Sequence, residues 1–370
     1  MLKIQEILQK AEKLEYHVQD RWKCLTAEQK VYIYGTSITA EIAYHALKKN
    51  SIQVCGFIND NIEEQNTMKH GIWVTGLKEI PQNSFIVVSV LEKSCLVVKK
   101  LLEKGYSKYI EYAMLHFYKP EDFTIPYTIF SDIIRYSYLD ILENFKKYEF
   151  LYNKLYDGKS KDVLENILNY RVSLNSLYFY DIKETKEQYF DENIISLKTQ
   201  EIFVDCGGYD GEVSKKFAEK TQNQYQKVFL FEPDPSLLQK ARKTLAGQEN
   251  IVFYQKGCYH KNGTVLFEST GNMSGYVSEE GTCQIETIRL DDAIQEATFI
   301  KIDIEGSELK ALEGMQRIIR QGKPTIAIAL YHKPNHLWEI PEYLYSLCKE
   351  YQFFLRTYTY SIPETILYCK

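Results

Sequence analysis

The chain has 370 residues, a length that predicts two globular units rather than one small domain. Apolar residues make up 45% and charged residues 26% of it, a composition that excludes disordered and collagen-like chains. Lys and Arg number 45 against 50 Asp and Glu, and the resulting net charge of −5 offers no basic footprint for nucleic acid.

The eight cysteines form no C-x-x-C pair, so we expect reduced thiols in an intracellular protein. The N-terminus mixes charges into its apolar residues, which is not typical of a secretory signal. No run of residues is apolar and long enough to span a membrane. The sequence therefore predicts a cytoplasmic protein without a membrane span, and a homo-oligomer is compatible with it.

The first third of the chain alternates strand and helix patterns. Apolar residues at helical spacing predict an amphipathic helix over residues 2–22, and residues 31–61 predict a strand, a glycine turn, a helix and a second strand. Further strands are expected at 84–91 and near Tyr109, with a helix at 93–104 between them. We expect residues 1–120 to form a Rossmann-like domain that binds a nucleotide or nucleotide sugar, or a degenerate form that binds neither.

Two more regions follow. Residues 121–185 repeat apolar positions at helical spacing and predict a helical connector. Residues 186–370 again alternate strand-like and helix-like runs, including one helix over residues 307–322, and end in two β-rich runs that predict an antiparallel hairpin at a sheet edge. The expected fold class is α/β, with two Rossmann-like sheets joined by a helical connector.

The loop after the strand at 202–205 carries the clearest motif. Dinucleotide folds use G-x-G-x-x-G to bring the backbone close to a pyrophosphate, whereas this loop has adjacent glycines and two carboxylates that suit a cationic ligand. S-adenosylmethionine has a sulfonium, an ammonium and no phosphate. The candidate cofactor-binding residues of this loop are Asp205, Cys206, Gly207, Gly208, Asp210 and Gly211.

Two later strands add to the predicted cofactor site. Glu232 ends the next strand, 27 residues beyond Asp205, where a carboxylate can accept hydrogen bonds from ribose hydroxyls. The third strand leads into a glycine turn with Gly257 and Cys258. We expect S-adenosylmethionine as the cofactor and S-adenosylhomocysteine as its product; the alternative is a tight turn that binds no ligand.

Four segments carry a family resemblance, namely FVDCGGYDGE, FEPDP, IKIDIEGSE and the tail IALYHKPNHLWEIPEYL with ETILY. With the lead-in segments NYRVSLNSLYFY and QYF, residues from about 160 to 370 resemble the FkbM-type family of S-adenosylmethionine-dependent methyltransferases. The resemblance implies a seven-stranded methyltransferase sheet with an antiparallel last strand. It also implies O-methylation of a hydroxyl on a sugar, nucleotide sugar, glycan or natural product, with a small-molecule or glycan acceptor as partner.

The resemblance assigns roles to particular residues. It implies that Asp205, Gly207 and Gly208 hold the methionine side of the cofactor, that Glu232 binds the ribose, and that Asp303 lies beside the methyl group. Many methyltransferases place an Asp or Asn after the third strand to hold the adenine. Here that segment is QKGC, so Gln255 or backbone groups would do this.

Transfer to an alcohol needs a base or a metal that removes the proton. The candidate catalytic residues Asp303, Glu305 and His332 follow strands at the edge where open α/β sheets bind ligands. His332 is a good base because an unperturbed imidazole titrates near neutral pH, although it could instead satisfy a loop carbonyl. A Mg²⁺ ion held by these residues is the alternative to a base, but we assign no residue as a metal ligand.

Other functions stay open at this point. One is an NAD-linked sugar-nucleotide oxidoreductase that uses the first domain, although Ser37 and Ala40 stand where its loop would have glycines. Another is a non-catalytic scaffold. The segment GNMSGY, residues 271–276, is expected to be a loop over the site. The leading hypothesis is sugar methylation in surface polysaccharide or natural-product biosynthesis.

Overall fold

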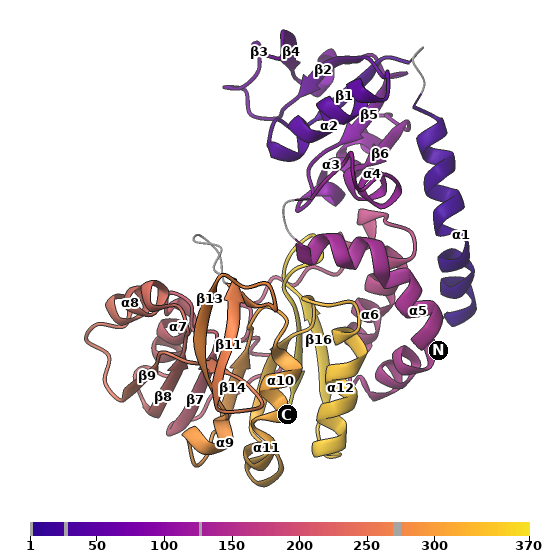
Figure 1. Ribbon diagram of the computed structural model, residues 1–370. Coiled ribbons are helices and arrows are strands. Elements are labelled where there is room, and N and C mark those ends of the chain that lie inside the picture. The colour runs from indigo at the N-terminus through magenta and orange to yellow at the C-terminus, as the bar shows by residue number, and fades with distance from the viewer. Residues whose placement is uncertain (1–2, 26–28, 126–127, 269–274) are drawn as a thin grey trace. The chain divides into compact units, whose positions relative to one another are not determined.

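The computed structural model describes residues 3–25, 29–125, 128–268 and 275–370. The chain divides into two compact units (Figure 1). The first comprises Met1–Glu149, Asp162–Lys183 and Thr359–Pro363, and the second comprises Phe150–Lys161, Glu184–Tyr358 and Glu364–Lys370. Residues 121–185 are therefore shared between the units.

The first unit contains a six-stranded sheet in the order β3-β4-β2-β1-β5-β6. The five strands from β4 to β6 pair in parallel, while β3 runs antiparallel to β4. The predicted first helix and the βαβ unit are present; the β3–β4 hairpin has no counterpart among the predicted elements. The elements are α1 (Ile4–Lys23), β1 (Val31–Tyr34), α2 (Ile38–Lys49), β2 (Val54–Ile58), β3 (Thr67–Lys69), β4 (Ile72–Thr75), η1 (Leu77–Glu79), β5 (Phe85–Val88), α3 (Ser94–Glu103), β6 (Tyr109–Glu111) and α4 (Tyr112–Tyr118).

Helices follow, as the spacing of apolar residues predicts. They are α5 (Thr128–Lys154), α6 (Gly158–Arg171) and the short 3₁₀ helix η2 (Ser176–Phe179). Among the described residues, no helix is both long and apolar enough to cross a membrane.

The second unit is built on a seven-stranded sheet in the order β16-β17-β15-β14-β7-β8-β9. Five strands are parallel, and β17 runs antiparallel to both of its neighbours, which confirms the predicted sheet with its antiparallel last strand. Every residue of the central strands β7 and β14 is buried, as expected for a parallel sheet covered on both faces. The strands are β7 (Glu201–Cys206), β8 (Tyr225–Phe231), β9 (Ile251–Tyr254), β14 (Phe299–Ile302), β15 (Thr325–Ala329), β16 (Phe353–Thr357) and β17 (Thr365–Cys369).

Six helices of the described chain belong to this unit: α7 (Glu212–Lys220), α8 (Pro235–Thr244), α9 (Leu290–Ala293), α10 (Glu308–Glu313), α11 (Gln316–Gly322) and α12 (His336–Leu347). Helix α8 starts where Asp234 accepts hydrogen bonds from the N–H groups of Ser236 and Leu237. The single helix predicted over 307–322 is wrong, because α10 ends before Gly314. Met315, with φ −129° and ψ 25°, separates α10 from α11. A Cβ at the preceding Gly314 would lie 2.0 Å from the carbonyl oxygen of Tyr259, so only glycine fits there.

A second, four-stranded sheet lies in the same unit, in the order β10-β13-β11-β12. Figure 1 shows β11 and β13 side by side, in orange, and they pair in an antiparallel ladder. The sequence indicated β11 but not this sheet. Its strands are β10 (Gly257–Cys258), β11 (Gly263–Glu268), β12 (Tyr276–Val277) and β13 (Cys283–Ile288). Most of the predicted loop at 271–276 lies outside the described residues.

Candidate active site

The loop after β7 can be formed only with glycines at two positions. Gly207 has φ +82°, and a Cβ there would lie 1.9 Å from the carbonyl oxygen of Asp303. A Cβ on Gly208 would lie 2.3 Å from Cγ of Leu230. The N–H groups of both glycines donate to the carbonyl of Phe231, at 3.0 and 2.9 Å, so the loop is attached to the end of β8.

The two carboxylates of this loop, Asp205 and Asp210, form contacts that hold the turn in place. Asp205 is fully buried, forms an ion pair with Lys301 at 3.2 Å and accepts a hydrogen bond from the Ser214 hydroxyl at 2.7 Å. Asp210 accepts from the N–H of Glu212 at 3.3 Å, at the start of α7. Both carboxylates thus have partners within the protein.

Three more predicted residues flank the loop. Gly211 precedes α7 with φ +85°, a left-handed conformation that favours glycine. Cys206 and Cys258, at the ends of β7 and β10, are both buried, with their sulfur atoms 3.3 Å apart.

Glu232 follows β8 and is held by the backbone on both sides. Its two carboxylate oxygens accept hydrogen bonds from the N–H groups of Tyr209 and Asp234, each at 3.0 Å. Burial raises the pKa of Glu232 to about 7. The carboxylate is therefore fixed in orientation and changes charge close to neutral pH.

A cavity opens between these elements and the end of β14. The second sheet supplies an apolar wall with Phe267, Val277 and Ile285. The predicted residues that line the cavity are Gly207, Glu232, Gly257, Cys258, Asp303 and Glu305. The structure thus gathers six candidates around one cavity, while His332 and the remaining loop residues lie outside its lining.

Asp303 sits directly after β14, at the carboxyl edge of the sheet. Its carboxylate accepts a hydrogen bond from the Tyr189 hydroxyl at 2.5 Å and lies 3.4 Å from Nε2 of His332. Burial raises the pKa of Asp303, although the positive charges of His332 and Lys301 oppose the shift. Each of Asp303, Glu305 and His332 has a ligand atom within 4.8 Å of the others, so this group could also hold a cation.

His332 is buried among three carboxylates. Its Nε2 lies 3.3 Å from Glu305, and its Nδ1 lies 2.8 Å from Glu308. Burial alone would lower the pKa of His332, but Glu308, Glu305 and Asp303 together hold it well above the usual value. The surrounding carboxylates therefore favour the imidazolium over the proton-free imidazole expected of a base.

Glu308 is a fully buried residue to which the sequence reasoning gave no role. Its carboxylate accepts hydrogen bonds from the N–H groups of Ile304 and Gly306, at 3.0 and 3.2 Å, and contacts His332 and His336. Burial would raise its pKa, but the two histidines hold the pKa well below the usual value. The motif IKIDIEGSE contains this residue, so the signal was present in the sequence.

Two tyrosines were also missed. Tyr189 adopts φ +67°, which is rare for a bulky residue, and its N–H donates to the Tyr368 hydroxyl at 2.9 Å while its own hydroxyl binds Asp303. The Tyr331 hydroxyl lies 3.3 Å from both oxygens of Asp303. In the sequence, only their positions pointed to these tyrosines: Tyr189 belongs to the segment QYF, and Tyr331 precedes His332.

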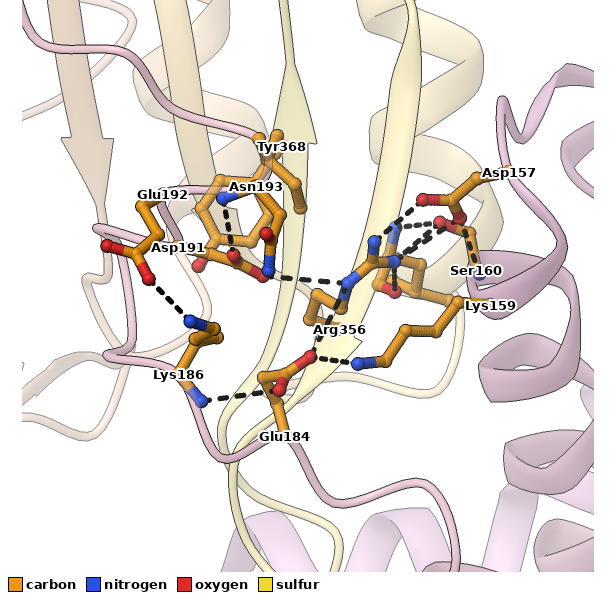
Figure 2. Close-up of polar contacts among 12 residues, drawn as sticks. Asp157, Lys159, Ser160, Glu184, Lys186, Asp191, Glu192, Asn193, Arg356 and Tyr368 are labelled. Carbon is orange, nitrogen blue, oxygen red and sulfur yellow. Dashed lines mark hydrogen bonds and ion pairs between the residues drawn. The ribbon is translucent and has the colours of Figure 1, made fainter.

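The segment that carries Tyr189 is tied to the sheet by the buried Arg356 of β16. Figure 2 shows its guanidinium between Asp157 and Ser160 on one side and Glu184 and Asp191 on the other. The contacts are 2.7 Å to Asp157, 2.9 Å to Ser160, 3.8 Å to Glu184 and 3.7 Å to Asp191. Residues 184–191 are thereby fixed on both sides of Tyr189.

Three features are typical of a methyltransferase fold: a loop with two glycines after β7, an acid at the end of β8, and a cavity at the carboxyl edge of a seven-stranded sheet. The family model described as methyltransferase FkbM domain matches residues 205–362. Residues 27–110 match a second model, described as C2185-like, N-terminal.

Three known proteins are similar to this chain over part or all of its length. A crystal structure of a methyltransferase FkbM from Methylobacillus flagellatus has the same fold over 100% of both chains, with a TM-score of 0.75 and 20% identity. The 2-O-methyltransferase NoeI of Sinorhizobium fredii is 23% identical over 39% of this chain and 67% of its own length. The hexuronic acid methyltransferase AglP of Haloferax volcanii is 28% identical over 25% of this chain and 43% of its own length. The match thus spans less than half of AglP.

Proposed function

We propose that this chain is an S-adenosylmethionine-dependent O-methyltransferase that acts on a hydroxyl of a sugar, a nucleotide sugar or a glycan. The observation that carries the proposal is that Gly207, Glu232 and Asp303 line one and the same cavity. Two relatives are named as a 2-O-methyltransferase and a hexuronic acid methyltransferase, which supports a sugar acceptor.

The residues of the cavity fit S-adenosylmethionine. Gly207 lines the cavity and has no side chain, so its backbone is available to a ligand. Glu232 would accept hydrogen bonds from the ribose hydroxyls, and the apolar wall of Phe267, Val277 and Ile285 would cover the adenine. When bound, the cofactor supplies a methyl group already activated by its sulfonium.

Asp303 is the proposed proton acceptor. Its pKa is raised by burial, which makes its carboxylate a stronger base than one in water. Tyr189 fixes one oxygen, and the other faces His332. In the proposed step Asp303 would take the proton from the acceptor hydroxyl as that oxygen receives the methyl group that the bound cofactor would supply. The imidazolium of His332 stabilises the negative charge on this carboxylate before the transfer.

Calorimetry with S-adenosylmethionine tests the cofactor assignment. The wild-type chain should bind it, and Glu232→Ala should bind it much more weakly. The exposed carboxylate of Asp292 lies outside the cavity lining, so Asp292→Asn is a matched control that should bind like the wild type. No binding by the wild type, or full binding by Glu232→Ala, would contradict the site.

Transfer of a labelled methyl group tests the reaction. Free hexuronic acids and nucleotide-linked sugars are the acceptors to assay first. Asp303→Asn and His332→Ala should each reduce transfer at least about 100-fold, the typical contribution of acid–base catalysis, while S-adenosylmethionine still binds. If both variants keep full activity, the roles of Asp303 and His332 are wrong even if the chain is a methyltransferase.

A further inference from the structure

A cluster of two histidines and a glutamate lies in the first unit, far along the chain from the candidate active site. Glu41 and His45 are one helical turn apart on α2, and His70 lies in the turn between β3 and β4. Each offers one ligand atom, and these atoms lie within 4.8 Å of one another. We propose that Glu41, His45 and His70 form a binding site for a divalent transition-metal ion of the zinc class.

The spacing of the ligand atoms fits such an ion. Nε2 of His45 lies 3.3 Å from Oε1 of Glu41, and Nε2 of His70 contacts the same oxygen. Ligands that each lie about 2.0 Å from a tetrahedral zinc are about 3.3 Å apart, so only a small movement of His70 would admit the ion. Two imidazoles and a carboxylate leave at least one position for water.

The surroundings hold two of the three ligands in place. Lys69 binds Oε2 of Glu41 at 2.7 Å, which leaves Oε1 directed at the two histidines. Tyr44 stacks on the His70 ring, with centroids 4.3 Å apart and planes 7° apart. Outer groups that orient a ligand in this way are typical of metal sites.

The backbone at His70 is a further sign. His70 has φ +54° and precedes Gly71 at φ +74°, so a histidine occupies a left-handed turn position. That conformation turns the imidazole toward Glu41 on α2. The side chain of His45 is 62% exposed and can therefore adjust, while those of Glu41 and His70 are 30% and 28% exposed. A bound ion would tie α2 to the β3–β4 turn.

The choice of metal follows from the ligands. Imidazole favours zinc, copper, nickel and cobalt, whereas Mg²⁺ and Ca²⁺ prefer sites made only of oxygen. The eight cysteines and the group of Asp303, Glu305 and His332 compete for such ions. The test must therefore separate nitrogen ligands from sulfur ligands and this site from the candidate active site.

The test is calorimetric titration of the full chain with ZnCl₂ after treatment with a chelator. We expect the wild type to bind an ion that His45→Gln and His70→Asn bind at least tenfold more weakly, whereas any ion held by Asp303, Glu305 and His332 would remain in both variants. Asparagine tolerates the left-handed backbone at position 70, so this variant keeps the turn. His17→Gln, which removes an exposed histidine from another helix of the same unit, should bind zinc like the wild type.

Two further measurements identify the ligands. Co²⁺ should give visible bands without a sulfur charge-transfer band, and Zn²⁺ should slow hydrogen exchange at residues 66–72 in the wild type but not in His70→Asn. A wild type that takes up no zinc would overturn the proposal. So would a sulfur charge-transfer band, or a loss of binding in His17→Gln equal to that in His70→Asn. Since the site shares no residue with the proposed active site, its failure would leave the proposed function unaffected.

Discussion

The two units place the same turn at the centre of their sheets. Gly35 follows β1, and Gly207 follows β7, each just before a helix. The N–H of Gly35 donates to the carbonyl of Ile58 at 2.8 Å, and that of Gly207 donates to the carbonyl of Phe231 at 3.0 Å. In both units the central strand is thus joined to its neighbour by the first glycine of the turn.

The turns differ in what lies beyond the glycine. In the second unit the acid at the next strand end, Glu232, binds backbone N–H groups and leaves a cavity beside the loop. In the first unit Glu64 accepts hydrogen bonds from Thr36 at 2.6 Å and Asn59 at 2.7 Å, and Lys69 donates to the Thr36 carbonyl at 3.1 Å. A glycine turn therefore fixes the backbone, while the neighbouring side chains decide whether a ligand finds room.

The largest expected effect comes from adding one methyl group to each turn. Gly207→Ala puts a Cβ against the Asp303 carbonyl, so the loop must move and we expect S-adenosylmethionine binding to fall by more than about 100-fold. Gly35→Ala meets the Ser89 hydroxyl at 2.8 Å with φ +115° and should destabilise the first unit by about 1–3 kcal/mol. Calorimetric binding and thermal unfolding of both variants measure this. Loss of binding in Gly35→Ala but not in Gly207→Ala would reverse the comparison.

The contrast between the turns shows how far the sequence could predict the molecule. Alternating strand and helix patterns predicted both sheets, and the terminal hairpin predicted the antiparallel strand β17. The residues that gather at the cavity, such as Glu232 and Asp303, follow strands of one parallel sheet, so topology alone brings them together.

The rest depended on contacts distant in sequence. Tyr189 lies 114 residues before Asp303, and nothing in its neighbourhood specifies that its hydroxyl binds this carboxylate. The charge of His332 was also beyond the sequence, because its pKa depends on how three carboxylates pack around it. The four-stranded sheet was missed in part because β10 and β12 have only two residues each, too few for a period-of-two pattern.

A second prediction concerns Arg356, whose ion pairs hold the segment that carries Tyr189 at the candidate active site. Arg356→Met would leave Asp191 buried without its cation, while Glu184 keeps its ion pair with Lys159. We expect the second unit to lose about 3–5 kcal/mol of stability. Lys323→Met removes an exposed ion pair with Glu350 and should change stability by less than about 1 kcal/mol. Differential scanning calorimetry separates the two. Equal effects would mean that the Arg356 cluster contributes no more than a surface pair.

A third prediction uses the acid at the end of the second strand. The pKa of Glu232 is raised to about 7, so the group is protonated below that pH and loses a hydrogen-bond acceptor for the ribose. Affinity for S-adenosylmethionine should therefore rise about tenfold from pH 6 to pH 8, the change in the ionised fraction. Glu232→Gln should bind weakly at both pH values. Asp60→Asn, after the second strand of the first unit, should keep the full pH dependence; a flat wild-type profile would contradict this role of Glu232.

The smallest expected effect concerns NADH, the ligand of the rival oxidoreductase hypothesis. The Glu64 carboxylate accepts a hydrogen bond from Thr36, in the turn where the diphosphate of NADH would bind. The negative charges of the carboxylate and of a diphosphate bound there would repel each other. We therefore expect no quenching of NADH fluorescence by the wild-type chain at micromolar concentrations. Glu64→Gln removes the charge but keeps a side chain of the same size against Thr36, so it too should leave NADH fluorescence unchanged. Micromolar binding of NADH by the wild type would contradict this expectation. It would show that Glu64 can move away from the turn at Gly35, so its side chain would not be what separates this turn from the turn at Gly207.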